Sequence, residues 1–257
     1  MSRTDRSRTP MTSTRRTALV AGAFYLLTFV SIPTLALYTP VHEPGYVSGP
    51  GPDGPVILGG VLELVVALAG IGTAVVLYPV VKRQNAALAL GFVSSRVLEA
   101  ATIVGGVVAL FSVVTLRQAD VGPDGDITGQ ALVALHDWFR MGQAYVPAVN
   151  ALLLGTLLYR SRLVPRFLPT LGLVGAPLLV VASTAQMFGG SDSPLWGLLV
   201  LPIAAWELSL GVYLVVKGFR PSPITAAIDS VATGLAPSAD SEPDPGRALV
   251  TSARQPR

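Results

Sequence analysis

Residues 86–116 read AALALGFVSSRVLEAATIVGGVVALFSVVTL, an apolar run that contains only two charged side chains, Arg96 and Glu99. A helix needs about 20 mostly apolar residues to cross roughly 30 Å of hydrocarbon, and this run exceeds that length. Its apolar residues do not alternate with polar ones, as the strands of a membrane barrel would require. The stretch therefore predicts a membrane-spanning helix.

Five further runs share this length and character, so six spans are expected in all. They are residues 17–38, 56–81, 86–116, 131–159, 165–188 and 195–217. Charged residues make up 13% of the 257 residues, against roughly 25% in soluble domains. The composition excludes an ordinary soluble domain. It predicts an all-α membrane protein, a six-transmembrane-helix bundle over residues 17–218, with the lipid bilayer as its first partner.

Lysine and arginine are distributed unevenly between the runs, and this predicts the orientation of the chain. Basic residues occupy the N-terminal arm and the connections after the second, fourth and sixth runs. The connections 40–55 and 189–194 contain no Lys or Arg, and 117–130 contains one Arg against three Asp. Positive charges stay on the cytoplasmic side. Both termini are therefore expected in the cytoplasm, the N-in/C-in topology.

The two ends of the chain differ in composition from the apolar domain. Residues 221–257 contain six prolines, mixed charges and no aromatic residue, and such a segment cannot bury enough apolar surface to fold. Residues 1–16 and 219–257 are thus expected to be disordered cytoplasmic tails, with a weak helical signal at 224–235. A cleaved signal is disfavoured because the first run is long and five more follow. Met11 is an alternative start.

Seven ionisable side chains lie inside the apolar runs, and they are the best lead to a function. They are Glu63, Arg96, Glu99, His136, Asp137, Arg140 and Glu207. A charge near the bilayer centre costs roughly 3 kcal/mol on insertion scales. A chain that only had to span the membrane would not carry seven such groups.

Depth in the membrane predicts which of these groups meet, because a helix rises about 1.5 Å per residue. Arg96 and Glu207 each lie ten residues from the cytoplasmic end of their runs, at a depth of about 15 Å. Glu63 and Arg140 both come to roughly 27–29 Å, in the outer half. We therefore predict two ion pairs, Arg96 with Glu207 and Glu63 with Arg140, and leave Glu99 as an additional group.

The fourth run carries a polar stripe at helical spacing. Its members are His136, Arg140, Gln143, Pro147 and Asn150, which recur at spacings of 4, 3, 4 and 3. One continuous helix would present them on one face, which should point into the bundle, with Asp137 beside it and His136 near the outer interface. Pro147 also frees the backbone carbonyl of Gln143, a polar opening of the kind that lines a cavity or is satisfied by a neighbour.

No cofactor, metal site or nucleic-acid partner is indicated. The chain has no Cys and only two His, which rules out thiolate chemistry and makes a His-rich zinc site a poor interpretation. The net charge of +3 is explained by basic residues that flank apolar runs. Phosphate-loop, zincin and nucleophile-elbow patterns do not occur in the sequence.

Several short stretches, taken in order, resemble a known family. They are Arg16-x-Ala18…Gly22-x-x-Tyr25-Leu26-Leu27, Leu77-Tyr78-Pro79-Val80-Val81-Lys82, Arg96-Val97-Leu98-Glu99-Ala100, Leu135-His136-Asp137, Leu158-Tyr159-Arg160-Ser161-x-x-Val164-Pro165-Arg166 and Glu207-Leu208…Tyr213-Leu214-Val215-Val216-Lys217-Gly218. Over about residues 15–220 the set is similar to the bacterial membrane family called domain of unknown function 4386. The resemblance implies six spans in a bacterial plasma (inner) membrane and marks Arg96, Glu99 and Glu207 as family-type positions. It implies no activity.

The polar core is open to three functional interpretations. The favoured one is a site that binds or transports a small molecule or protons, and transport by so few helices would require a homodimer. Its expected residues are Arg96, Glu207, Glu63, Arg140, Glu99, Asp137, His136, Gln143 and Asn150. The first alternative is a structural or regulatory membrane subunit without a ligand. The second, which we disfavour, is an intramembrane enzyme acting on a lipid or isoprenoid, with Asp137 and His136 near the outer leaflet.

Overall fold

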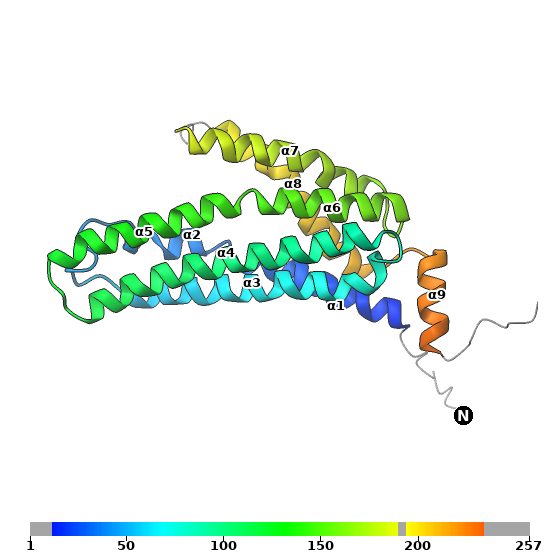
Figure 1. Ribbon diagram of the computed structural model, residues 1–257, viewed down its shortest axis with the longest axis horizontal. Coiled ribbons are helices and arrows are strands. Elements are labelled where there is room, and N and C mark those ends of the chain that lie inside the picture. Colours follow the sequence, from blue (N-terminus) through cyan, green and yellow to red (C-terminus); the bar gives the residue numbers. More distant parts are fainter. Residues whose placement is uncertain (1–11, 190–193, 234–257) are drawn as a thin grey trace, which may run out of the picture.

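The computed structural model describes residues 12–189 and 194–233, and within these ranges every regular element is helical (Figure 1). Six helical spans are long and apolar enough to cross a membrane. Large apolar side chains stand exposed along them, such as Leu68 at 69% and Leu98 at 59% exposure, which suits a lipid-facing surface. The expected all-α, multi-pass fold is therefore confirmed.

The spans follow the order expected from the sequence, and two of them consist of more than one helix. The first comprises α1 (Ser13–Leu27), η1 (Thr28–Ser31) and α2 (Thr34–Leu37), and η2 (Thr39–His42) follows it. The second and third are α3 (Asp53–Val81) and α4 (Ala86–Gln118). The fourth divides into α5 (Asp124–Gln143) and α6 (Val146–Ser161). The last two are α7 (Phe167–Met187) and α8 (Pro194–Val216), before a short α9 (Pro223–Ala232).

The helices are arranged as neighbouring antiparallel pairs. The α3–α4 and α7–α8 pairs are both extensive, α1 packs on α3 and α8, and α6 packs between α4 and α7. In Figure 1, α7 and α8 diverge from α5 at one end of the bundle, while α9 lies across the other end. The main core lies where α1, α3, α4, α6, α7 and α8 meet, around the buried side chains of Phe92, Leu154 and Trp206.

Small residues let these helices approach closely, as in other membrane bundles. A Cβ at Gly175 of α7 would stand 2.8 Å from the backbone nitrogen of Ile203 on α8. A Cβ at Gly172 would stand 2.7 Å from the ring of Trp206. The close contact between α7 and α8 therefore requires glycine, which has no side chain, at these two positions.

Two findings, one near each terminus, correct the expected tails. The first helix begins at Ser13, so residues 13–16 are helical. Residues 223–232 form α9, which confirms the weak helical signal in that region and contradicts disorder there. Asp229 of α9 accepts hydrogen bonds from the backbone nitrogen (3.0 Å) and hydroxyl (2.8 Å) of Thr14, so α9 docks against the first turn of α1. Residues 1–11 and 234–257 lie outside the described residues.

The first span is interrupted where a continuous helix was expected over 17–38. After Leu27 the chain tightens into η1, and Pro33 cannot continue the hydrogen-bond ladder. Three hydroxyls donate to the carbonyls three residues earlier: Thr28 to Tyr25 at 2.7 Å, Ser31 to Thr28 at 3.0 Å and Thr34 to Ser31 at 2.6 Å. Side-chain hydroxyls thus add hydrogen bonds to backbone carbonyls where the helix is interrupted.

The fourth span is interrupted as well, between Gln143 and Val146, so it is not one helix over 131–159. Pro147 has no backbone N–H for the carbonyl of Gln143, and this is the position at which a proline is expected to break the ladder. The sequence indicated the freed carbonyl. It did not indicate that the helix would end there and restart.

Candidate functional site

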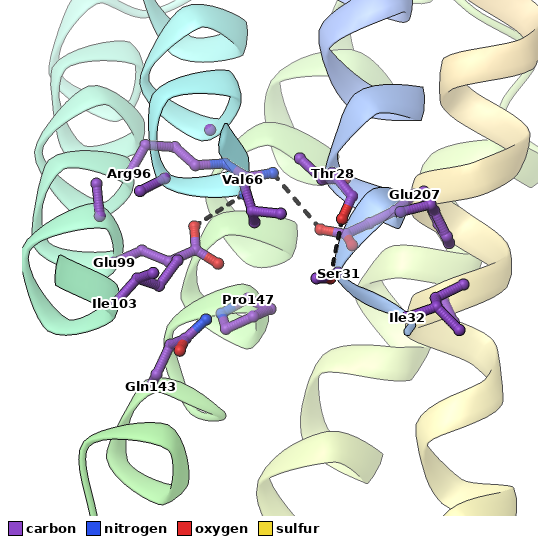
Figure 2. A pocket seen from close by; sticks show the side chains of 15 residues that line it. Thr28, Ser31, Ile32, Val66, Arg96, Glu99, Ile103, Gln143, Pro147 and Glu207 are labelled. Atoms are coloured by element: carbon purple, nitrogen blue, oxygen red, sulfur yellow. Dashed lines mark hydrogen bonds and ion pairs between the residues drawn. The ribbon is translucent and has the colours of Figure 1, made fainter. Parts of the chain in front are cut away.

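Arg96 is the centre of a buried ion-pair cluster near the middle of the bundle. Its side chain is 4% exposed and projects from α4. Nη1 donates to the Oε2 atom of Glu99 at 2.8 Å, and Nη2 lies 3.5 Å from Oε1 of Glu207 on α8 (Figure 2). The predicted Arg96–Glu207 contact is therefore confirmed, because the two residues share a depth on neighbouring faces.

Glu99 is bound more tightly in this cluster than Glu207. The same Oε2 atom that pairs with Arg96 also accepts a hydrogen bond of 2.8 Å from Nδ2 of Asn150 on α6. Glu99 was expected to be an additional group. It is instead the principal counter-ion of Arg96 and links α4 to α6.

Two aromatic rings complete the surroundings of the guanidinium. Its Cζ atom lies 5.4 Å from the ring centroid of Tyr25 on α1 and 5.7 Å from that of Phe92 on α4, within the range of cation–π attraction. Nη2 also donates to the Tyr25 hydroxyl at 3.4 Å. Tyr25 was not among the predicted site residues. Depth could have found it, since it lies about 12 Å along the first predicted span.

A cavity of about 330 Å³ adjoins this cluster. Its lining residues come from η1 and the residue after it, and from α3, α4, α5, α6 and α8. They are Thr28, Phe29, Ser31, Ile32, Val66, Ala67, Gly70, Arg96, Glu99, Ala100, Ile103, Gln143, Pro147, Ala204 and Glu207. Figure 2 shows Arg96 and Glu99 on one side of it and Thr28, Ser31 and Glu207 on the other. Both helix interruptions lie at its wall.

The cavity is lined by more carboxyl groups than guanidinium groups. Two carboxylates, Glu99 and Glu207, face the single guanidinium of Arg96. Glu207 has the longer contact with Arg96 and keeps 22% of its side chain exposed, against 10% for Glu99. Two buried polar atoms in this region, Nε of Arg96 and Oδ1 of Asn150, have no hydrogen-bond partner among the described residues. Such atoms in a native structure are usually satisfied by water or a ligand.

The second predicted ion pair, Glu63 with Arg140, makes no salt bridge in the structure, although Arg140 still acts electrostatically on the Glu63 carboxyl group. No oxygen of Glu63 lies within 4.0 Å of a guanidinium nitrogen of Arg140; instead, Nε of Arg140 lies 4.0 Å from Oδ1 of Asp137, and the Arg140 side chain is 51% exposed. Glu63 lies near Tyr38, whose burial and negative neighbour raise the pKa of the tyrosine hydroxyl. Equal depth brought the two charges near enough to interact electrostatically, but not into direct contact.

The remaining members of the predicted polar stripe do not gather at one site. His136 is buried at 2% exposure, with Nδ1 at 3.1 Å from the carbonyl oxygen of Gly106 and its ring edge-on to Tyr38, so it is not solvated at the interface. Asp137 lies 3.2 Å from Nε2 of His42, a residue that sequence analysis did not select. Of the stripe, only Gln143 and Pro147 line the cavity, and Asn150 reaches it through Glu99.

The described residues contain no group of three or more His, Asp or Glu side chains that could hold a metal ion. The cluster can therefore act through hydrogen bonds and charge, and the described part of the chain offers no metal centre for it.

Comparison with known proteins gave one match. The sequence profile of the family described as "Domain of unknown function (DUF4386)" matches residues 20–218. No curated protein and no solved structure matches the chain. The matched range contains all the residues that line the cavity and ends before α9.

Proposed function

Because the chain belongs to the DUF4386 family, whose description assigns no activity, we propose its function from geometry: it binds a small polar molecule in the cavity beside Arg96 and Glu207. The observation that carries this proposal is the cavity itself. A volume of about 330 Å³ is within the range of small-molecule sites, which starts at roughly 300 Å³.

The two interrupted spans support this proposal. Discontinuous helices near the bilayer midplane form the substrate sites of many transporters, because a helix end turns backbone polar groups towards the ligand. Thr28, which caps α1, and Gln143, the last residue of α5, both line the cavity. The same arrangement would suit a carrier, which six spans would form most readily as a homodimer.

A purely structural role explains the cluster less well. Ion pairs that only hold helices together need no adjoining space and gain stability when every polar atom is satisfied. Here Glu207 remains partly exposed to a cavity, and Nε of Arg96 has no partner among the described residues. The charges exceed what helix packing requires.

The orientation belongs to the same proposal. The basic connections support a topology with both termini in the cytoplasm of a bacterial cell and the chain in its plasma membrane. Arg96 and Glu207 then lie near the midplane, and Gln143 approaches the cavity from the outer half. A ligand would reach the site from the outside through the region between the two helix interruptions.

A thermal-shift screen of small polar compounds tests the proposal on the purified full-length protein in detergent. We expect some compounds to raise the unfolding temperature of the wild type but not of Ala204→Leu, because Leu would occupy part of the cavity. Ala205→Leu is the matched control, since Ala205 is exposed on the same helix. A library that stabilises neither the wild type nor Ala205→Leu would contradict binding at this site.

A further inference from the structure

We infer that the ligand of this cavity is a small organic ammonium ion, held with its charged nitrogen at the Glu207 carboxylate. The inference rests on the proposed function and names its ligand class. It follows from three independent features of the cavity: the excess negative charge, the ends of the helices that line it, and the chemistry of its apolar wall.

The first feature is the pairing of charges. Arg96 forms a salt bridge of 2.8 Å with Glu99, and Asn150 donates a hydrogen bond of 2.8 Å to the same carboxylate. Glu207 is left with a contact of 3.5 Å, and its Oε2 atom accepts no hydrogen bond from the described residues. With both carboxylates ionised, the three side chains carry a net charge of −1. A cation would neutralise this excess, whereas an anion would face the Glu207 carboxylate.

The second feature is the direction of the interrupted helices. α1 and α5 both end at the cavity, and the last carbonyls of a helix carry partial negative charge. The hydroxyl hydrogens of Thr28 and Ser31 are already donated to backbone carbonyls, so their oxygens can only accept. α6 begins nearby with its positive end, but its second residue is Pro147, which has no N–H to offer. These groups supply acceptors to the polar lining, while the unpaired Nε of Arg96 and the side-chain amide of Gln143 supply its donors.

The third feature is the remaining wall, which is apolar. Phe29, Ile32, Val66, Ile103 and Ala204 contribute side chains to it. The volume of about 330 Å³ exceeds the need of a bare alkali cation and suits an organic molecule. Phe29 also belongs to this wall, and aromatic rings attract alkylammonium groups by cation–π interaction. Charge and apolar area together specify a short alkylamine in its protonated form.

A series with one alkyl chain and different head groups tests the assignment. The unfolding temperature of the full-length protein in detergent is measured at neutral pH with n-butylammonium, 1-butanol, sodium butyrate or potassium chloride at matched ionic strength. We expect n-butylammonium alone to stabilise the protein in a concentration-dependent manner. Glu207→Gln should weaken its apparent affinity at least about tenfold, since a hydrogen bond to a charged group is lost.

Glu63→Gln is the matched control, because it makes the same substitution at a buried glutamate that does not line the cavity. An equal loss of affinity in Glu63→Gln would overturn the inference, since the effect would then not come from the cavity.

Equal stabilisation by butanol or butyrate would overturn the inference that the ligand is a cation, while leaving small-molecule binding intact. Equal stabilisation by potassium chloride would show that a simple metal cation suffices and would overturn the inference that the ligand is organic. Stabilisation by other screened compounds but not by n-butylammonium would overturn this inference alone. If no compound binds, the proposed function fails with it.

Discussion

Asn150 donates a hydrogen bond of 2.8 Å to the Glu99 carboxylate, and through this bond α6 holds the counter-ion of a buried arginine on α4. The two residues are far apart in sequence and meet only because α4 and α6 pack against each other. The bond fixes the Glu99 carboxylate towards Arg96, which leaves Glu207 as the carboxylate available to the cavity.

Replacing Asn150 with Leu should therefore lower the free energy of unfolding by about 1–3 kcal/mol, because a buried carboxylate loses a donor. Chemical unfolding of the purified protein in detergent measures this loss. Val149→Leu serves as the control, since Val149 is the preceding residue and is 46% exposed. Equal stability of the two variants would show that the bond contributes nothing.

Arg96→Met should be more severe, with a loss of about 3–5 kcal/mol, because it leaves Glu99 and Glu207 buried without a counter-ion. The double variant Arg96→Met/Glu99→Gln should recover part of that loss, because one uncompensated carboxylate is removed with it. Arg140→Met carries the same change at a side chain that is 51% exposed and should stay within about 0.5 kcal/mol of the wild type. The prediction fails if the Arg96 and Arg140 variants unfold alike.

The close packing of α7 on α8 predicts opposite effects for two glycine substitutions. Gly175→Ala should destabilise the protein by about 1–3 kcal/mol, because its new methyl group would stand 2.8 Å from a backbone atom that cannot yield cheaply. Gly197→Ala should raise stability by about 0.5–1 kcal/mol, since a methyl group there meets nothing within 4 Å and alanine favours the helix. Unfolding temperatures in the same detergent compare them, and the reverse order would contradict the packing.

The orientation can be tested with single cysteines, because the chain contains none of its own. Glu43→Cys and Gln84→Cys place a thiol at exposed positions in the connections after the first and second spans. A membrane-impermeant maleimide applied to intact cells should label the thiol at position 43, and the thiol at position 84 only after the membrane is opened. The opposite pattern would place both termini outside.

Local composition was enough to predict the spans. The run around Arg96 is apolar over a length that only a membrane helix explains, and α4 extends from Ala86 to Gln118, two residues beyond the predicted end. The length of an apolar run and the charges at its ends are properties of neighbouring residues, so they can be read without knowing the packing. The same holds for depth, and depth correctly paired Arg96 with Glu207.

Depth is only one of the coordinates that bring two side chains together, and the others come from how the helices turn and pack. Glu63 and Arg140 have matching predicted depths yet make no salt bridge, whereas Glu99 and Asn150 meet because α4 and α6 present these faces to each other. His136 is buried against the Gly106 carbonyl for the same reason.

The sequence by itself determined that this chain has six helices able to cross a membrane, with ionisable groups inside their apolar runs. Only the tertiary structure decided that Pro147 and the Thr28–Ser31 turn interrupt two spans at one cavity, and that Glu207 is the less tightly held of the two carboxylates that line it. A membrane helix has little intrinsic preference for which face it turns inward when it is apolar on all sides. That choice is made by close packing at small residues and by the few buried polar contacts between helices.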